Sequence, residues 1–140
     1  MAGKNYEFIE HTADICIRVK GATLEDLFKN TALAMFEIIA EEKSPPHKNL
    51  EKIILEQKAE NIDELFINWL NELLSLSSAK ELVFSSFKIE IIDQKILKAE
   101  AHGSSYKDYN VLTEIKAATY HELTIKKVPS GWEAQVIFDV

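Results

Sequence analysis

The sequence contains little cysteine, glycine or proline and no long apolar run. A single thiol, Cys16, cannot form an intramolecular disulfide, so we expect a reducing, cytoplasmic setting. Four glycines and three prolines among 140 residues leave little room for disordered or repetitive segments. The longest charge-free stretches are far shorter than the ~18 apolar residues of a membrane span. No apolar segment of the secretory type precedes Tyr6. We therefore predict a folded protein with no membrane partner.

Arginine is almost absent, although the chain is rich in charge. The 23 acidic residues outnumber the 16 basic ones, which gives a net charge of -7, and Arg18 is the sole arginine. Guanidinium groups are the usual bidentate ligands of phosphates and guanine edges, so direct nucleic-acid binding is disfavoured. An acidic surface is better suited to a basic protein partner or to a hard divalent cation.

Hydrophobic periodicity divides the chain into strands and two helices. Helical spacing after Thr23 predicts a first helix to about Ala40, and a second helix follows Asn61 and ends between residues 75 and 80. Alternating residues predict strands at 6–10, 15–20, 53–59, 87–91, 97–101, 115–125 and 132–138. The sequence therefore predicts an α+β fold, with two amphipathic helices packed on a largely antiparallel β-sheet in a single compact domain over residues 1–140.

The sequence contains none of the strong catalytic motifs that occupy one continuous segment. Two weaker candidate sites lie near the ends of the chain. Residues 11–14 (HTAD) place His11 and Asp14 at a strand boundary, where they are either functional or ordinary turn formers. Asp139 is followed by Val140, whose terminal carboxylate would add oxygen ligands if the chain ends there. If the fold brings Asp14 beside Asp139, a hard cation could bind, whereas the alternative is a solvated last residue.

Two further candidate sites lie in the second half of the chain. His121 shares the strand parity of Ile115 and Leu123, so it is expected to face the core, either as a satisfied core histidine or beside a polar cavity. Residues 102–110 are polar and aperiodic, which predicts a long functional loop. Lys107 and Glu114 lie in and after that loop, either as a charged pair at its mouth or as solvated charges.

Five blocks of the sequence resemble the archease family, in the right order and with the right spacing to both ends of the chain. The blocks are residues 6–14 (YEFIEHTAD), 32–37 (ALAMFE), 69–74 (WLNELL), 114–121 (EIKAATYH) and 136–140 (VIFDV). The resemblance implies a small cytoplasmic accessory protein, not itself a catalyst, that activates the RtcB-type tRNA-splicing RNA ligase by promoting its guanylylation and multiple turnover. Transfer RNA would be met only indirectly, through that ligase.

The same resemblance implies site residues. It implies a divalent metal, calcium in the family, held by Asp14, Asp139 and an oxygen of Val140. It also places the family's functional lysine and glutamate on Lys107 and Glu114. Two alternatives stay open: a stand-alone metal-dependent hydrolase that uses His121 as its base, and a chaperone-like binding module with a structural metal.

Overall fold

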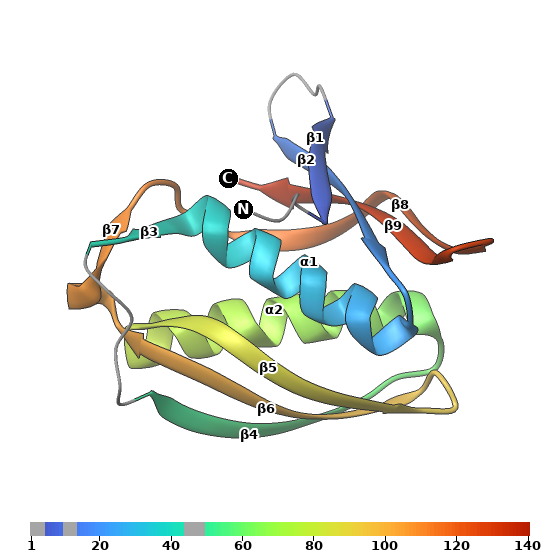
Figure 1. The fold of residues 1–140 in the computed structure, drawn as a ribbon, viewed down its shortest axis with the longest axis horizontal. Helices are drawn as coiled ribbons and strands as arrows, with labels where there is room; N and C mark the ends of the chain where they lie inside the picture. Colours follow the sequence, from blue (N-terminus) through green and yellow to red (C-terminus); the bar gives the residue numbers. More distant parts are fainter. Residues whose placement is uncertain (1–4, 10–13, 44–49) are drawn as a thin grey trace.

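Two helices form the middle layer of the fold and lie between two antiparallel sheets (Figure 1). The structure is a computed structural model, and it describes residues 5–9, 14–43 and 50–140. Helix α1 spans Leu24–Ile39 and helix α2 spans Ile62–Lys80. In the described part of the chain, neither helix is long and apolar enough to cross a membrane.

The two larger sheets each combine strands that are distant in sequence. The strands of the upper sheet in Figure 1 are β1 (Tyr6–Ile9), β2 (Ile15–Gly21), β8 (Ala117–Val128) and β9 (Gly131–Asp139), in the order β1-β2-β9-β8. The strands of the lower sheet are β4 (Glu51–Lys58), β5 (Leu82–Ile92) and β6 (Ile96–Ser105), in the order β4-β6-β5. A small sheet pairs β3 (Ala40–Glu42) with β7 (Tyr109–Val111), beside the 3-10 helix η1 (Tyr106–Asp108). All pairings are antiparallel, which confirms the predicted α+β class.

Both helices begin at the capping residues that the sequence predicts. The Thr23 hydroxyl accepts a hydrogen bond from the Asp26 amide at 3.1 Å, and the Asn61 side chain accepts one from the Glu64 amide at 2.9 Å. These side chains satisfy backbone donors that the first helical turn leaves without partners. Helix α2 ends where Glu81 adopts a left-handed conformation with φ of 54°.

The core lies between the two sheets, and Trp69 of α2 is its largest fully buried side chain. The Trp69 indole nitrogen donates a hydrogen bond to the Phe28 carbonyl of α1 at 3.1 Å. Its ring packs edge-on against Phe87 of β5, with ring centroids 5.6 Å apart. Trp69 of α2 therefore connects α1 and the lower sheet through one side chain. It can be fully buried because its indole nitrogen has a hydrogen-bond partner.

The segment 102–110 differs from the predicted long loop. Strand β6 continues to Ser105, η1 follows at once, and β7 then pairs with β3. The prediction was wrong because β6 continues to pair with β5 through its polar end: Gly103 lies opposite Phe84 and Ser105 opposite Leu82. Cross-strand pairing thus overrides the weak local strand propensity of these residues.

His121 does not face the core, so that expectation was also wrong. Between Thr119 and Thr124 the register of β8 advances five residues while the paired strand β9 advances two, from Ile137 to Gln135. This bulge breaks the alternation of faces on which the prediction depended. Glu122 within it has a positive φ of 52°, and the His121 side chain is 68% exposed.

Gly131 in the turn between β8 and β9 is a position where a side chain cannot fit. Its φ is +139°, and an added Cβ would overlap the carbonyl oxygen of Gly21. We expect Gly131→Ala to lower the free energy of unfolding by on the order of 1–3 kcal/mol, since both strain and overlap oppose it. Urea unfolding measures the effect, with the exposed neighbour Ser130→Ala as the control. Equal midpoints for the two variants would contradict this assignment.

Candidate functional site

The two aspartates predicted as metal ligands lie at the same end of adjacent strands. Asp14 directly precedes β2 and Asp139 is the last residue of β9. These strands pair antiparallel with Ile15 opposite Phe138, so the next step of the register sets Asp14 beside Asp139. Residues directly opposite each other in such a pair point to the same face of the sheet. The fold therefore brings two residues that are far apart in the sequence, Asp14 and Asp139, to the same strand end.

A third segment reaches this strand end from the other side of β9. Ala117, the first residue of β8, lies opposite Asp139. The Lys116 amide donates a hydrogen bond to the Asp139 carbonyl at 2.8 Å. The backbone of Asp139 is thus fixed by β8 while its side chain and Val140 remain exposed. Such an arrangement holds the end of β9 in place and leaves its oxygens accessible to a ligand.

The donor types at this strand end fit a hard divalent cation. Carboxylate and carbonyl oxygens are the ligands that calcium and magnesium prefer in proteins, and Asp14, Asp139 and Val140 supply only such oxygens. Among the residues described, no three His, Cys, Asp or Glu side chains are grouped as a metal site. In the predicted donor set, an oxygen of Val140 joins the two aspartates. His11 lies outside the described residues.

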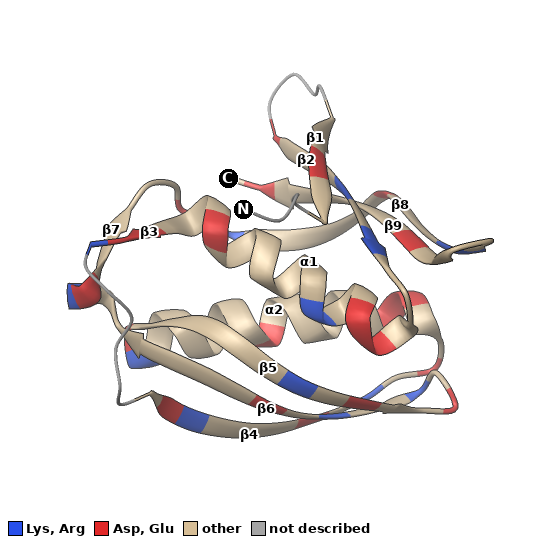
Figure 2. Cartoon of the chain, in the orientation of Figure 1, with Lys and Arg blue, Asp and Glu red and all other residues tan. Residues whose placement is uncertain are grey.

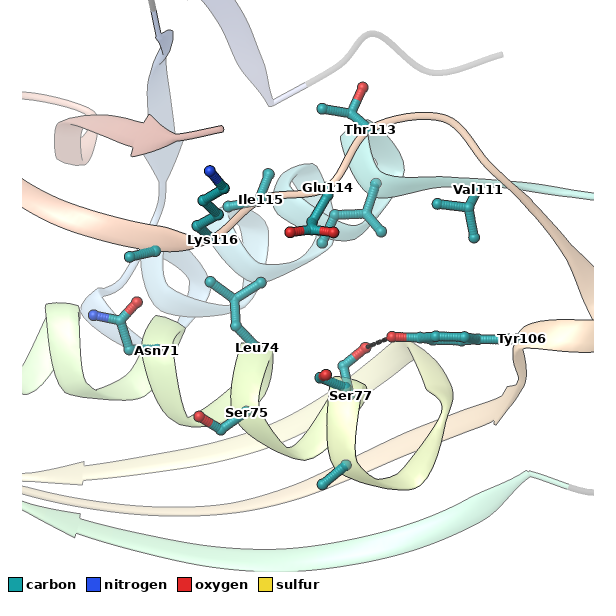
Figure 3. A pocket seen from close by; sticks show the side chains of 14 residues that line it. Asn71, Leu74, Ser75, Ser77, Tyr106, Val111, Thr113, Glu114, Ile115 and Lys116 are labelled. Carbon is teal, nitrogen blue, oxygen red and sulfur yellow. Dashed lines mark hydrogen bonds between the residues drawn. The ribbon is translucent and has the colours of Figure 1, made fainter.

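A groove of about 760 Å³ opens beside this strand end, between α2 and the segment that leads from β7 into β8. Figure 3 shows the α2 side chains Leu74 and Ser75 on one wall and Glu114 on the other, with Tyr106 at one end. Glu114 lies over the gap between the segment and α2, whereas Lys116 points away from α2. The carboxylate of Glu114 is consequently the acidic group of the groove.

Lys107 does not accompany Glu114 in this site. It is exposed on η1, its amide bonds to the Ser105 hydroxyl at 3.2 Å, and it is absent from the lining of the groove. The structure gives no ion pair between Lys107 and Glu114, both of which are among the described residues. Lys116 is the lysine on the segment beside Asp139. The sequence analysis did not single out Lys116 as a site residue, although it lies two residues after Glu114 in the block 114–121.

His121 lies within the bulge of β8, away from the strand end that carries Asp139. Its imidazole nitrogen is 3.6 Å from a carboxylate oxygen of Glu122. Ala117, not His121, is the residue of β8 opposite Asp139. The structure therefore does not bring His121 together with the two aspartates.

The single thiol is close in sequence to Asp14 but has no feature of a nucleophile. Cys16 on β2 is 2% exposed. Its pKa is raised, first by burial and then by the negative charge of Glu122, against a smaller opposing effect of Arg18. A buried thiol with a raised pKa is protonated at neutral pH and unreactive. We therefore assign Cys16 to packing.

Asn71 of α2 positions the beginning of β8. Its side-chain amide donates to the Ala118 carbonyl at 3.1 Å, and its side-chain oxygen accepts from the Ala118 amide at 2.8 Å. This double hydrogen bond replaces the strand partner that β8 lacks on its outer edge. Asn71 is therefore a positioning residue for the segment between the groove and Asp139, and its place in the third sequence block could have indicated it.

We expect Asn71→Ala to lower the free energy of unfolding by about 1–3 kcal/mol, because it leaves the Ala118 backbone groups without their partners. Asn68→Ala is the matched control on the same helix, because the Asn68 side chain makes no hydrogen bond in the described part of the chain. Its effect should stay within about 0.5 kcal/mol. Urea unfolding of both variants tests this, and a control as damaging as Asn71→Ala would argue against the positioning role.

Comparison with known proteins places this architecture among small α+β proteins of one family. The solution structure of Methanobacterium thermoautotrophicum protein 1598 is similar, with a TM-score of 0.76 and 27% identity, over 99% of this chain and 100% of that one. A crystal structure from Thermotoga maritima, described as an archease and possible chaperone, has a TM-score of 0.64 at 23% identity and covers 94% of each chain. The second likeness supports the fold alone.

Sequence comparison identifies the family. The model of the Archease protein family (MTH1598/TM1083) matches residues 6–140. "Protein archease" of Methanosarcina barkeri is 40% identical over 99% of this chain and 97% of its own length. "Protein archease" of Pyrococcus furiosus is 38% identical over 98% of this chain and 99% of its own. The chain belongs to the archease family.

Proposed function

We propose that this protein activates an RtcB-type tRNA-splicing RNA ligase by promoting its guanylylation and its repeated turnover. The observation that carries the proposal is membership of the archease family over residues 6–140. On this proposal the working surface is the exposed end of β9.

In the proposed mechanism, Asp14, Asp139 and an oxygen of Val140 hold a divalent cation at this surface. When bound there, the cation would supply positive charge for neutralising phosphate oxygens during nucleotidyl transfer. Asp14 and Asp139 would orient that charge outward, because β2 and β9 end side by side. The hydrogen bond from the Lys116 amide would keep Asp139 in register with β8. Calcium is the cation that we propose.

Single-turnover guanylylation of the ligase, with and without this protein, tests the proposal. We expect a faster approach to the guanylylated ligase and a larger number of ligation cycles when the protein is present. An unchanged rate together with improved recovery of denatured ligase would instead support a chaperone-like module. Nucleotide hydrolysis by the protein alone would support the hydrolase alternative, in which His121 would have to act away from the aspartate pair.

Direct binding of tRNA is expected to be weak. Figure 2 shows basic segments scattered over both sheets among acidic ones. Lys126 is 3.8 Å from Glu133 on β9, while Lys98 lies in the other large sheet, opposite Glu90 and Glu56. With a net charge of -7 and one arginine, the protein repels a polyanion. In a titration at physiological salt, free tRNA should bind weakly and lose affinity steeply with added salt. Tight, salt-resistant binding would contradict the indirect role of tRNA.

A further inference from the structure

The groove beside α2 is large enough to take a side chain of a partner together with the residues next to it. Its volume is about 760 Å³, and two separate parts of the chain line it. Residues of α2 one turn apart, Asn71, Ser75 and Ser78, form one wall, and residues 111–117 form the other. Both walls are held in place, because Asn71 bonds to the Ala118 backbone. The groove is thus built before any ligand enters it.

Glu114 and Lys116 are the charged residues that line the groove, and both are exposed. The carboxylate has no hydrogen bond or ion pair among the described residues. Figure 3 shows it over the gap beside Leu74, while the ammonium group of Lys116 points away from α2. The carboxylate beside the gap can pair with a cation that enters the groove, whereas the Lys116 ammonium group is turned away from the same space. The groove therefore favours a positively charged occupant.

Aromatic and hydroxyl groups line the rest of the groove. The Tyr106 hydroxyl lies 3.3 Å from the Ser77 hydroxyl, which in turn donates to the Leu82 carbonyl. This contact fixes the Tyr106 ring at one end of the groove (Figure 3). Its face can contact a guanidinium or ammonium group, and the exposed hydroxyls of Ser75 and Ser78 can accept hydrogen bonds from one. A carboxylate, an aromatic ring and hydroxyl acceptors together match the chemistry of arginine better than that of an apolar side chain.

Exposed apolar side chains border the same groove. Val111 is 59% exposed and Leu112 is 58% exposed, and Val111 is part of the lining. Large apolar groups that a folded chain leaves in solvent beside a pocket are typical of a surface that binds another protein. They give no advantage to a small free cation, because it would not cover them.

We propose that the groove binds an arginine or lysine side chain of a protein partner, with Glu114 as its counter-ion and Val111 and Leu112 as the surrounding contact. The identification of that partner with the RNA ligase rests on the proposed function. The occupancy of the groove by a basic side chain does not rest on it. The site is distinct from the aspartate pair, since Glu114 belongs to the groove and not to the end of β9.

The first test uses N-acetyl-arginine amide as the probe and the neutral N-acetyl-citrulline amide as its control. In two-dimensional NMR of the intact protein, the arginine probe should shift the backbone amides of Ser78, Tyr106 and Glu114, and the citrulline probe should shift them little. Glu114→Gln should abolish the difference, because it removes the charge and keeps the shape. Equal shifts with both probes, shifts elsewhere, or tighter binding of spermidine in the groove would overturn the proposal.

The second test measures the affinity of the RNA ligase for variants of this protein. Glu114→Gln should weaken binding by about tenfold or more, as removal of one partner of an interfacial charge pair does. Glu90→Gln on the exposed face of β5 is the matched control and should bind as the wild type does. Calcium affinity, measured by calorimetry on both variants, should be unchanged, because Glu114 is not one of the proposed ligands.

The two proposals fail in different ways. If the wild type binds and activates the ligase and Glu114→Gln does so equally well, the groove proposal is overturned and the proposed function stands. If the wild type neither binds nor activates the ligase, the proposed function fails, and the comparison of the two amide probes alone decides whether the groove takes a basic side chain.

Discussion

Asp139→Asn and Asp14→Asn should each reduce stimulation of the RNA ligase to the unstimulated rate. Both residues lie at the same end of adjacent strands of one sheet, and in the proposed metal site each would supply oxygens of its own. Calcium affinity should fall by at least about tenfold, since loss of even an outer-shell partner of a metal typically costs about 10–100-fold. Calorimetric titration with calcium and single-turnover guanylylation of the ligase measure the two effects on the same preparations.

Folding stability separates a lost ligand from a damaged fold in these variants. Two carboxylates side by side repel each other when no cation is bound, so removal of one charge relieves that repulsion. In chelator, the melting temperatures of both variants should therefore equal or exceed that of the wild type. Glu90→Gln, which removes a carboxylate from the other sheet, should leave calcium binding and ligase stimulation unchanged. Normal stimulation by both aspartate variants would show that the cation is incidental.

Local patterns in the sequence were sufficient to predict both helices and most strands. The capping residues Thr23 and Asn61 are each followed directly by a helix, because a side-chain hydrogen bond to the third residue is a local interaction. The β5–β6 hairpin was also predicted, because two alternating segments are joined by a short polar link. In the structure, Asp93 and Gln94 form its turn with positive φ values of 53° and 58°. Interactions of such short range depend on residues that are close in the sequence, so sequence patterns can predict them.

The errors have a different origin, in contacts that no local pattern records. His121 was placed on the core face by counting residues, and the bulge in β8 invalidates that count. Strands β3 and β7 have three residues each, too few for a detectable alternation, and they form because they pair with each other. Non-local pairing therefore determines the parts of the fold that sequence periodicity missed.

The candidate site could be predicted only in pieces. Asp14 and Asp139 came together through the resemblance to the archease family, because no pattern in the chain indicates that β2 and β9 are neighbours. Lys107 was associated with Glu114 by the resemblance and by their positions in and after segment 102–110, but strand β7 lies between them and only Glu114 lines the groove. The groove was not predicted at all, since its walls come from α2, Tyr106 and the segment 111–117. Sites of this kind depend on tertiary packing.

Trp69→Ala should destabilise the fold more strongly than either Gly131→Ala or Asn71→Ala. The side chain is fully buried, contacts Phe87 of the lower sheet and bonds to the Phe28 carbonyl of α1. Truncation leaves a large cavity and removes the hydrogen bond between α2 and α1, at a cost of about 3–5 kcal/mol. Against a typical stability of about 5–15 kcal/mol, such a loss lowers the urea midpoint strongly. Equilibrium unfolding followed by circular dichroism measures it.

Trp69→Phe separates the hydrogen bond from the packing. Phenylalanine keeps an aromatic ring against Phe87, so this substitution should cost much less than alanine. It cannot donate to the Phe28 carbonyl, and the loss of that hydrogen bond should cost about 1–3 kcal/mol. Trp132→Phe is the matched control, because Trp132 is only partly buried, at the start of β9. It should change the urea midpoint little. If Trp132→Phe lowers the urea midpoint as much as Trp69→Ala does, the loss of stability is not specific to Trp69, and the connecting role assigned to Trp69 is contradicted.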